Sequence, residues 1–369
     1  MKRTIIALAL IAVMIAACGP KAPETYGIAV TGALTGPSAQ DGNEILNGAT
    51  LAAEVVNAAG GVNGKMIEVI AEDDRSDPKE AANVANKLVN DPRVLAVIGH
   101  YNSSCTLAGA PIYNKAGLLE TSAGSSSPLV AEAGPYTFRV IPTDSFQGDV
   151  VAKWMVEDLG LKKVAIFWEN DDYGKGLRDV IAERVEFYGG EVVGDESYIF
   201  GETKDFSPLI TKVRAAEPDA LFLAGLYNEA TLIAKQGKEV DWTPALFGVD
   251  AIYSALYTEM GGDAVEGTKL IGFFHTSNPD PKVQEFVKAF TEKYGVAPGT
   301  YAAYGYDAMM IYVEAIKNAG PDRAKMMEWM TTLKDYEGIS GTTSFNEDGD
   351  VIKVPLYLEV KGGEFTIIE

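Results

Sequence analysis

The chain has 369 residues, of which 47% are hydrophobic and 22% charged, a composition typical of folded proteins and a length sufficient for two domains. Its 31 basic and 52 acidic residues give a net charge of −21, which argues against binding to nucleic acid or to anionic lipid. The cysteines and histidines (Cys18, Cys105, His100 and His275) are too few and too scattered for a metal cluster, and no cofactor is predicted.

The first 17 residues are typical of an export signal. Lys2 and Arg3 precede an apolar run from Ile5 to Ala17, about 20 Å long as a helix and therefore too short to span ~30 Å of hydrocarbon. Two alanines and then Cys18 end this run, which resembles the cleavage box of bacterial lipoproteins, where the cysteine becomes the diacylated N-terminus. An ordinary signal peptide with an incidental cysteine is the alternative. We expect residues 18–25 to be a tether and the protein to be anchored to a membrane only through Cys18.

Strand and helix patterns alternate along the rest of the chain. Strands are predicted in the first half over Tyr26–Thr31, Met66–Ala71, Val94–Ile98 and from Leu118, with helices over Asp41–Ala59, Pro78–Val89 and Ser104–Ala116. The second half is predicted to hold strands over Val164–Trp168, Val192–Ser197, Ala220–Ala224 and Ala245–Gly248, with helices over Phe146–Leu159, Gly174–Tyr188, Pro208–Ala215 and Glu229–Gln236. Helices over Pro281–Tyr294, Tyr304–Ala319 and Arg323–Leu333 precede a tail of strands and hairpins.

This alternation predicts parallel sheets covered by helices on both faces, and its two runs of about 120 residues predict two such lobes. Ligands of such sheets bind beyond the carboxyl ends of the strands. Two loops there, Gly99–Ser104 and Thr121–Pro128, are rich in small polar residues. Hydroxyl groups and free amides at helix starts can receive a carboxylate, although plain helix capping explains the same residues.

Short motifs in a fixed order resemble the leucine/isoleucine/valine-binding protein family of periplasmic receptors. They are Thr35-Gly36-Pro37, Val56-Asn57-Ala58-Ala59-Gly60-Gly61, Glu72-Asp73-Asp74, Asp77-Pro78, Ile98-Gly99-His100, Asp172-Tyr173-Gly174, Gly248-Val249-Asp250 and Tyr304-Gly305-Tyr306-Asp307. The resemblance covers nearly the whole mature chain. It implies an α/β fold of two Rossmann-like lobes, the type I or Venus-flytrap periplasmic binding protein.

The resemblance also implies the division of the chain and its partners. The chain would cross between the lobes at a three-stranded hinge near Thr143, Phe274 and Tyr336. Lobe 1 would then hold residues 26–143 and 275–335, and lobe 2 residues 144–274 and 336–369. Members of the family close around one small solute and present it to the permease subunits of an ABC transporter. We therefore expect a monomeric binding protein and not an enzyme.

Site residues carried over from the family place the two ends of an amino acid. The resemblance assigns the α-carboxylate to Ser103, Ala123 and Ser125, the α-ammonium to Asp250, the cap to Tyr173 and the side-chain wall to Tyr301. A zwitterion loses its water on enclosure, so each of its ends needs charge-assisted hydrogen bonds. Taken alone, Asp250 could be an ordinary surface acid.

Several positions depart from the family pattern. Asp41 stands where members carry an aromatic ring, and Leu226 where they carry a tyrosine, although Tyr227 adjoins it. Tyr101 and Asn102 replace an aliphatic residue and a cysteine, so the family's disulfide is absent. A carboxylate at Asp41 needs a hydrogen-bond donor. We therefore expect a ligand with a hydroxyl, amide or amine beyond its α-carbon, unless Asp41 caps the helix that follows.

An enzyme and a sensory receptor are the two alternatives to a binding protein. The sequence has no Gly-x-Ser-x-Gly motif after a strand, and His100 is expected to pack or to fix the serine-rich loop rather than act as a base. A receptor fused to its own membrane helix would need an apolar span after the tail, and the sequence ends at Glu369 without one. A sensor of the same fold that acts through a separate partner stays an alternative, with an amide, urea-like or aromatic-acid ligand.

Overall fold

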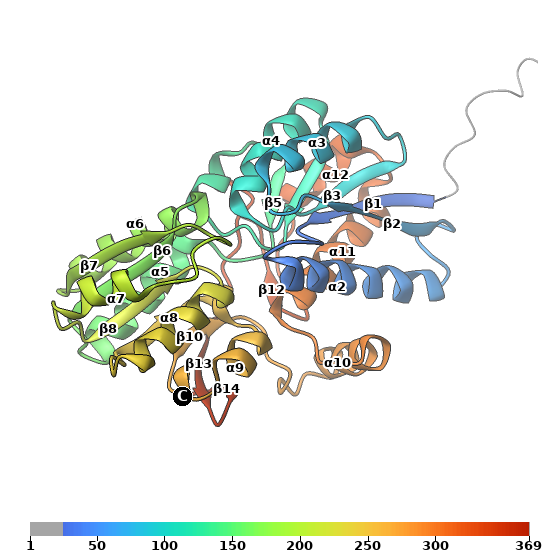
Figure 1. The fold of residues 1–369 in the computed structure, drawn as a ribbon. Coiled ribbons are helices and arrows are strands. Elements are labelled where there is room, and N and C mark those ends of the chain that lie inside the picture. The colour runs from blue at the N-terminus through green and yellow to red at the C-terminus, as the bar shows by residue number, and fades with distance from the viewer. Residues whose placement is uncertain (1–24, 369) are drawn as a thin grey trace, which may run out of the picture.

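The computed structural model describes residues 25–368, which form two α/β lobes (Figure 1). The sheet of lobe 1 is all-parallel, with its strands in the order β2-β1-β3-β4-β5. These strands are β1 (Thr25–Gly32), β2 (Met66–Asp73), β3 (Val94–Ile98), β4 (Leu119–Ser122) and β5 (Thr137–Arg139). The central strands β1, β3 and β4 are buried along almost their whole length, as expected where helices cover both faces of a parallel sheet.

The main helices of lobe 1 begin and end within four residues of the predicted ranges, whereas the short 3-10 turn after β4 was not predicted. They are α2 (Ala39–Ala58), α3 (Pro78–Val89), α4 (Ser103–Ala116), the 3-10 turn η1 (Pro128–Glu132), α10 (Pro281–Tyr294), α11 (Thr300–Ala319) and α12 (Arg323–Thr331). Asp77 caps α3 by accepting a hydrogen bond from the Lys79 N–H at 2.7 Å. Helices α2 and α11 touch backbone to backbone, since a Cβ at Gly48 would lie 1.9 Å from the Ala302 carbonyl oxygen.

The sheet of lobe 2 has seven strands in the order β14-β13-β10-β9-β8-β6-β7. They are β6 (Lys163–Glu169), β7 (Glu191–Tyr198), β8 (Ala220–Ala224), β9 (Ala245–Gly248), β10 (Lys269–Gly272), β13 (Leu356–Lys361) and β14 (Glu364–Ile367). Five of the strands are parallel, and β13 and β14 extend the sheet as an antiparallel hairpin. This hairpin turns at Gly362-Gly363, as predicted, where both φ angles are positive.

Lobe 2 contains the four predicted helices and three short helical elements after β9 that were not predicted. The full set is α5 (Asp144–Lys153), the π-helical turn η2 (Trp154–Asp158), α6 (Asp172–Phe187), α7 (Ser207–Arg214), α8 (Tyr227–Glu239), η3 (Asp250–Ile252), α9 (Ala255–Gly261) and η4 (Gly262–Ala264). The unpredicted elements α9, β5 and β10 have only 7, 3 and 4 residues, too few to show a period.

The chain passes between the lobes from β5 to α5, from β10 to α10, and once more before β13. The third passage lies later than the predicted Tyr336. Strands β11 (Tyr336–Gly338) and β12 (Gly341–Thr343) form a hairpin that Asp307 of α11 holds on lobe 1, accepting a hydrogen bond from the Ile339 N–H at 2.9 Å. Asp350 is also held by lobe 1, through Arg139 of β5. The lobe 2 segment therefore begins after Asp350.

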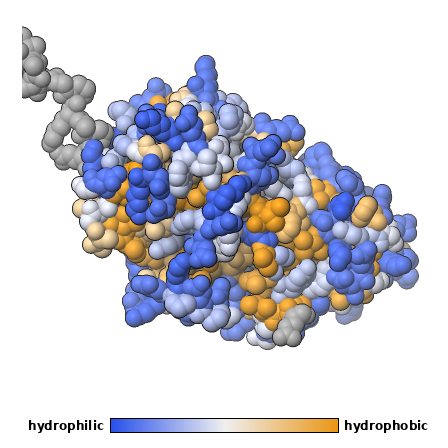
Figure 2. Space-filling view, turned by 180° about the vertical axis from the view of Figure 1, so that it is seen from behind, coloured by the Kyte–Doolittle hydropathy of each residue, from blue (hydrophilic) through white to orange (hydrophobic). Residues whose placement is uncertain are grey.

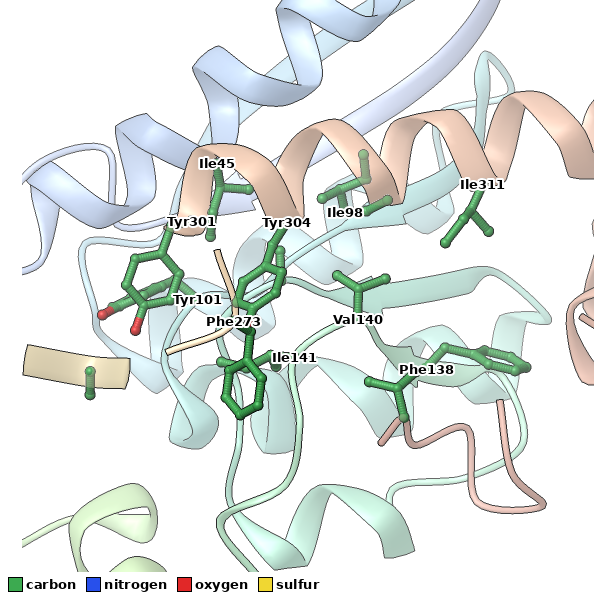
Figure 3. Close-up of a cluster of buried hydrophobic side chains, with 14 of the residues drawn as sticks. Ile45, Ile98, Tyr101, Phe138, Val140, Ile141, Phe273, Tyr301, Tyr304 and Ile311 are labelled. Carbon is green, nitrogen blue, oxygen red and sulfur yellow. The ribbon is translucent and has the colours of Figure 1, made fainter. Parts of the chain in front are cut away.

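The two lobes are closed against each other. Asn228 Nδ2 of α8 donates to the Pro37 carbonyl oxygen across the gap at 3.0 Å, and the Ser127 hydroxyl donates to the Asp172 carbonyl oxygen at 3.0 Å. The largest hydrophobic cluster continues from lobe 1 into lobe 2 and includes Phe273 (Figure 3). On the face of the molecule that is turned away from the viewer in Figure 1, polar side chains surround several apolar patches (Figure 2). Among residues 25–368, every helix is too short or too polar to cross a membrane.

Candidate functional site

A small cavity lies between the lobes at the carboxyl ends of both sheets. Its lining residues are Tyr101, Asn102, Ser103, Gly124 and Ser126 with Tyr301 from lobe 1, and Tyr173, Leu226 and Ala251 from lobe 2. Six of these nine belong to the predicted site, namely Tyr101, Asn102, Ser103, Tyr173, Leu226 and Tyr301. The structure thus brings together residues that are up to two hundred positions apart in the sequence.

The amino end of α4 forms one wall of this cavity. Asn102 is the N-cap of α4 and Ser103 is its first residue, and both are buried. The first amides of a helix have no partner within the helix and carry a partial positive charge, so they favour an anion. This end of the cavity can receive a carboxylate.

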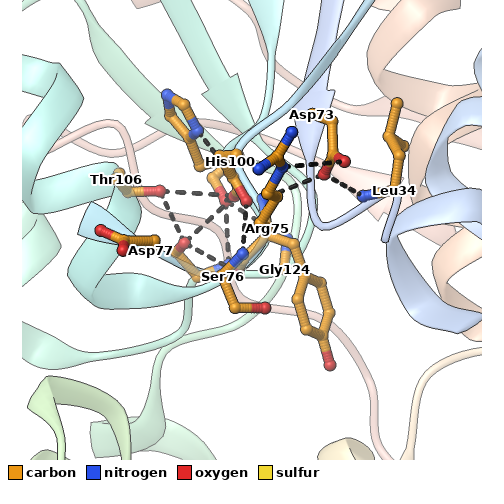
Figure 4. A network of polar contacts seen from close by, with 12 residues as sticks. Leu34, Asp73, Arg75, Ser76, Asp77, His100, Thr106 and Gly124 are labelled. Atoms are coloured by element: carbon orange, nitrogen blue, oxygen red, sulfur yellow. Dashed lines mark hydrogen bonds and ion pairs between the residues drawn. The ribbon is translucent and has the colours of Figure 1, made fainter. Parts of the chain in front are cut away.

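The serine-rich loop after β4 forms the neighbouring wall, with its side chains in a different register from the one predicted. The Ser125 hydroxyl lies 3.2 Å from the His100 carbonyl oxygen and 2.7 Å from the Thr106 hydroxyl. His100 and Thr106 belong to a polar network inside lobe 1 (Figure 4). The chain bends at Ala123 and Gly124, and the Ser122 hydroxyl accepts hydrogen bonds from the N–H groups of Gly124 and Ser125. Gly124 and Ser126 line the cavity, whereas the predicted contacts Ala123 and Ser125 are not among its lining residues.

His100 fixes this loop, as predicted. Its Nδ1 lies 2.6 Å from Asp74 Oδ2 and its Nε2 lies 3.1 Å from the Tyr113 hydroxyl, and the ring is fully buried. Its carbonyl oxygen also accepts a hydrogen bond from the Ser122 hydroxyl at 2.6 Å. Both ring nitrogens are thus engaged within lobe 1, away from the serines of the cavity wall.

Asp41 lies behind the cavity wall, in a role that neither predicted alternative described. It is the third residue of α2, whose N-cap is Ser38, and its carboxylate accepts a hydrogen bond from the Tyr101 hydroxyl at 2.7 Å. Burial raises the pKa of Asp41 to about 7, against the lowering effect of that bond. The Tyr101 ring in turn packs edge-on against Tyr301, with centroids 5.1 Å apart (Figure 3). Asp41 therefore obtains its donor from the protein.

Lobe 2 contributes a buried acid, Asp250, which is not itself among the lining residues of the cavity. It begins η3 directly before the cavity-lining Ala251 and is 1% exposed, and its Oδ2 has no hydrogen-bond partner among residues 25–368. Burial raises the pKa of Asp250 to about 7, against the lowering effect of hydrogen bonds from Gln147 and the Ala251 N–H. A buried carboxylate with one oxygen left without a donor favours a cation beside it.

Tyr227 does not line the cavity. Leu226 is the N-cap of α8 and faces the cavity, whereas Tyr227 packs in the core of lobe 2 with Phe206 and Ile252. Of the three lining residues that were not predicted, Gly124 and Ser126 alternate with predicted positions and Ala251 follows one. Gly124 and Ser126 lie in the polar loop Thr121–Pro128 that the sequence pointed to, but the sequence does not show which residues of a loop turn toward the cavity.

Metal chemistry finds no support in the part of the chain that the structure describes. No group of three or more His, Cys, Asp or Glu side chains is placed there to hold an ion. Cys105 is a buried free thiol. Cys18, the predicted site of lipidation, lies outside the described residues.

Comparisons with known proteins agree with this architecture. The family model described as periplasmic binding protein matches residues 25–364. An amino acid binding protein of Pseudomonas aeruginosa is 34% identical over 97% of this chain and 95% of its own length. The leucine-, isoleucine-, valine-, threonine-, and alanine-binding protein of the same organism is 32% identical over 94% and 90%. The crystal structure of a branched-chain amino acid transporter substrate-binding protein of Streptococcus pneumoniae with isoleucine superposes with a TM-score of 0.86, at 30% identity over 92% and 97%.

Proposed function

The chain belongs to the periplasmic binding protein family, and from that membership we propose that it captures a small amino acid between its lobes and delivers it to an ABC transporter permease. Members of the family are exported substrate-binding proteins of ABC transporters and are not enzymes. A ligand-dependent sensor with a separate membrane partner would use the same closure. Delivery to a permease is favoured because the relatives above are named for transport and amino acid binding.

The observation that carries the proposal is that two kinds of group lie on the two sides of one cavity. Ser103, Ser126 and the amino end of α4 lie at the cavity on lobe 1. On lobe 2, Asp250 adjoins the lining residue Ala251, and its Oδ2 has no partner among residues 25–368. An α-amino acid matches this arrangement, with its carboxylate at the serines and its ammonium at Asp250.

The side chain of the ligand is proposed to be uncharged. Its surroundings would be the rings of Tyr101 and Tyr301 and the aliphatic Leu226. The carboxyl of Asp41 is already paired with Tyr101 and so does not demand a donor from the ligand. The ligand therefore does not need the hydroxyl, amide or amine beyond its α-carbon that the sequence led us to expect. Small aliphatic amino acids and small hydroxylated amino acids both fit.

A thermal-shift panel tests the ligand class. The twenty L-amino acids, acetamide, urea and benzoate are each added in excess, because a ligand that binds only the native state raises Tm. We expect the largest increase with a small uncharged amino acid. The matching acid without its amino group should give less than a third of that increase. A larger shift with benzoate, acetamide or urea would contradict the proposal and favour the alternative ligands.

We further propose that Cys18 is diacylated and anchors the exported protein to a membrane. The support is the sequence before Cys18, a charged start, a short apolar run and two alanines. Cys18→Ser should move the protein from the membrane fraction to the soluble fraction and leave ligand affinity unchanged. Cys105→Ser is the matched control and should stay with the membranes. A Cys18→Ser protein that still sediments with membranes would refute the anchor.

A further inference from the structure

Arg139, at the end of β5, joins the serine-rich loop to the third passage between the lobes. Its side chain is 1% exposed. Its Nη1 donates to the carbonyl oxygens of Ser127 at 2.7 Å and Ser125 at 3.3 Å. Its Nε donates to Asp350 Oδ1 at 2.5 Å, and its backbone N–H donates to the Gly349 carbonyl oxygen at 3.0 Å. A single guanidinium thus holds two carbonyl groups of the loop and one carboxylate of the passage.

These hydrogen bonds fix the direction in which the carbonyl groups of the serine-rich loop point relative to the cavity. Between the two carbonyls held by Arg139, that of Ser126 accepts a hydrogen bond from the Asp144 N–H at 2.8 Å. In a planar trans peptide the N–H points opposite to the carbonyl. The Ser127 N–H accordingly points away from the Ser126 carbonyl, and it donates to the hydroxyl of the cavity-lining Ser103 at 3.3 Å. The peptide after Ser127 has no N–H, because Pro128 follows it, so Arg139 fixes the direction of its carbonyl group alone.

The orientation matters for an anion. A carboxylate is attracted by N–H and O–H donors and repelled by carbonyl oxygens. If the carbonyls of Ser125 and Ser127 lost their donor, rotation of these peptides would bring acceptors toward the cavity. Lysine could not replace the arginine, because a single ammonium lacks the planar fork that reaches several acceptors at once.

We propose that Arg139 is a positioning residue for ligand binding, which holds the carbonyl groups of Ser125 and Ser127 away from the ligand's carboxylate and ties that loop to the third passage through Asp350. The inference rests on the proposed function, because it assumes an α-amino acid as ligand. Arg139 itself is not among the residues that line the cavity. Its effect on binding is therefore indirect, through the loop.

The test compares two probes by titration calorimetry. One is the L-amino acid that gives the largest shift in the thermal panel, and the other is the matching amino alcohol, in which CH₂OH replaces the carboxylate. Arg139→Lys should weaken binding of the amino acid at least about tenfold and binding of the alcohol less than about threefold. The ratio of the two affinities, that for the amino acid divided by that for the amino alcohol, should therefore be several-fold lower in the variant than in the wild type. A merely structural role would weaken both probes alike and leave this ratio unchanged.

Two further variants keep the test decisive. Arg323→Lys is the matched control, because Arg323 also donates to a backbone carbonyl of lobe 1. This carbonyl belongs to Val94, at the amino end of the central strand β3 and so at the end of the sheet opposite to the cavity. This control variant should change neither the affinity for the amino acid nor the ratio of the affinities for the two probes. Asp350→Asn removes the charge that anchors the guanidinium and should lower the ratio about threefold. It decides the question if circular dichroism shows that Arg139→Lys does not fold.

The outcomes separate the two proposals. A wild-type protein that binds no amino acid in the panel overturns the proposed function and this inference with it. Binding by the wild type with an unchanged ratio in Arg139→Lys and Asp350→Asn overturns the inference alone.

Discussion

The two halves of the cavity differ in how far the protein satisfies its own polar groups. On lobe 1 the hydroxyls of Ser122 and Ser125 and the carbonyls of the serine-rich loop are held by His100, Asp144 and Arg139. On lobe 2 the Asp250 Oδ2 and the Tyr173 hydroxyl have no partner among residues 25–368. The serine-rich loop of lobe 1 is therefore held by the protein itself, although the Asn102 Oδ1 at the cavity has no partner among residues 25–368. On lobe 2 a buried carboxyl oxygen is left for a cation or a proton from outside.

Removal of the charge on lobe 2 should have the largest effect. Asp250→Asn keeps the size of the side chain but leaves the ligand's ammonium without its partner, at a cost on the order of 2–5 kcal/mol. The expected loss of affinity is at least about thirtyfold, measured by calorimetry.

The control for this change lies at the other edge of the same sheet. Asp219 accepts hydrogen bonds from the N–H groups of Lys162 and Lys163 at 2.9 and 2.8 Å, far from the cavity. Asp219→Asn should bind as tightly as the wild type. A loss below threefold in Asp250→Asn would mean that the ligand carries no ammonium at Asp250.

A pH series sharpens the same contrast. Burial raises the pKa of Asp250 to about 7, so below pH 7 a proton occupies the carboxyl that the ammonium needs. Affinity should fall by about tenfold for each pH unit below 7 and level off above it. The dependence should flatten in Asp250→Asn, and an unchanged slope in that variant would assign the titration to another group.

The ligand-free protein should show the opposite trend in stability. Because the folded pKa of Asp250 lies above its usual value of 3.8, the protonated form is favoured in the folded state. This contribution to stability is present below pH 4 and is lost as the pH rises through 7. Asp41, whose pKa burial also raises to about 7, acts in the same direction. Thermal melts of the ligand-free protein should therefore give a lower Tm at pH 8 than at pH 5.

The smallest effect on binding is expected on lobe 1. Tyr101→Phe keeps the ring against Tyr301 but removes the donor to the buried carboxyl of Asp41, which should lower the free energy of unfolding by about 1–3 kcal/mol. Affinity should change by less than about threefold, because Asp41 and this hydroxyl are paired behind the wall. The double variant with Asp41→Asn should recover part of the stability. A tenfold loss of affinity would show that the hydroxyl contacts the ligand.

Much of the fold could be predicted from local patterns. Strands β3, β8 and β9 and helices α3 and α10 have the residue ranges expected from apolar runs, caps and prolines. Alternation of these elements indicated two parallel-sheet lobes, and the family motifs indicated how the lobes are joined. The third passage was misplaced at Tyr336, because a short hairpin on α11 and the bond from Arg139 to Asp350 hold that segment on lobe 1.

The sequence by itself determined which loops form the site and which kinds of group they carry. Apolar periodicity and the order of motifs are local properties, and they place the loops after β3, β4 and β9 at the same end of the fold. Only the tertiary structure decided the direction of each side chain. Ser126 rather than Ser125 faces the cavity because Ser125 bonds inside lobe 1, and Asp41 obtains its donor from Tyr101, sixty residues away. Such pairings depend on contacts between distant segments, which no local pattern records.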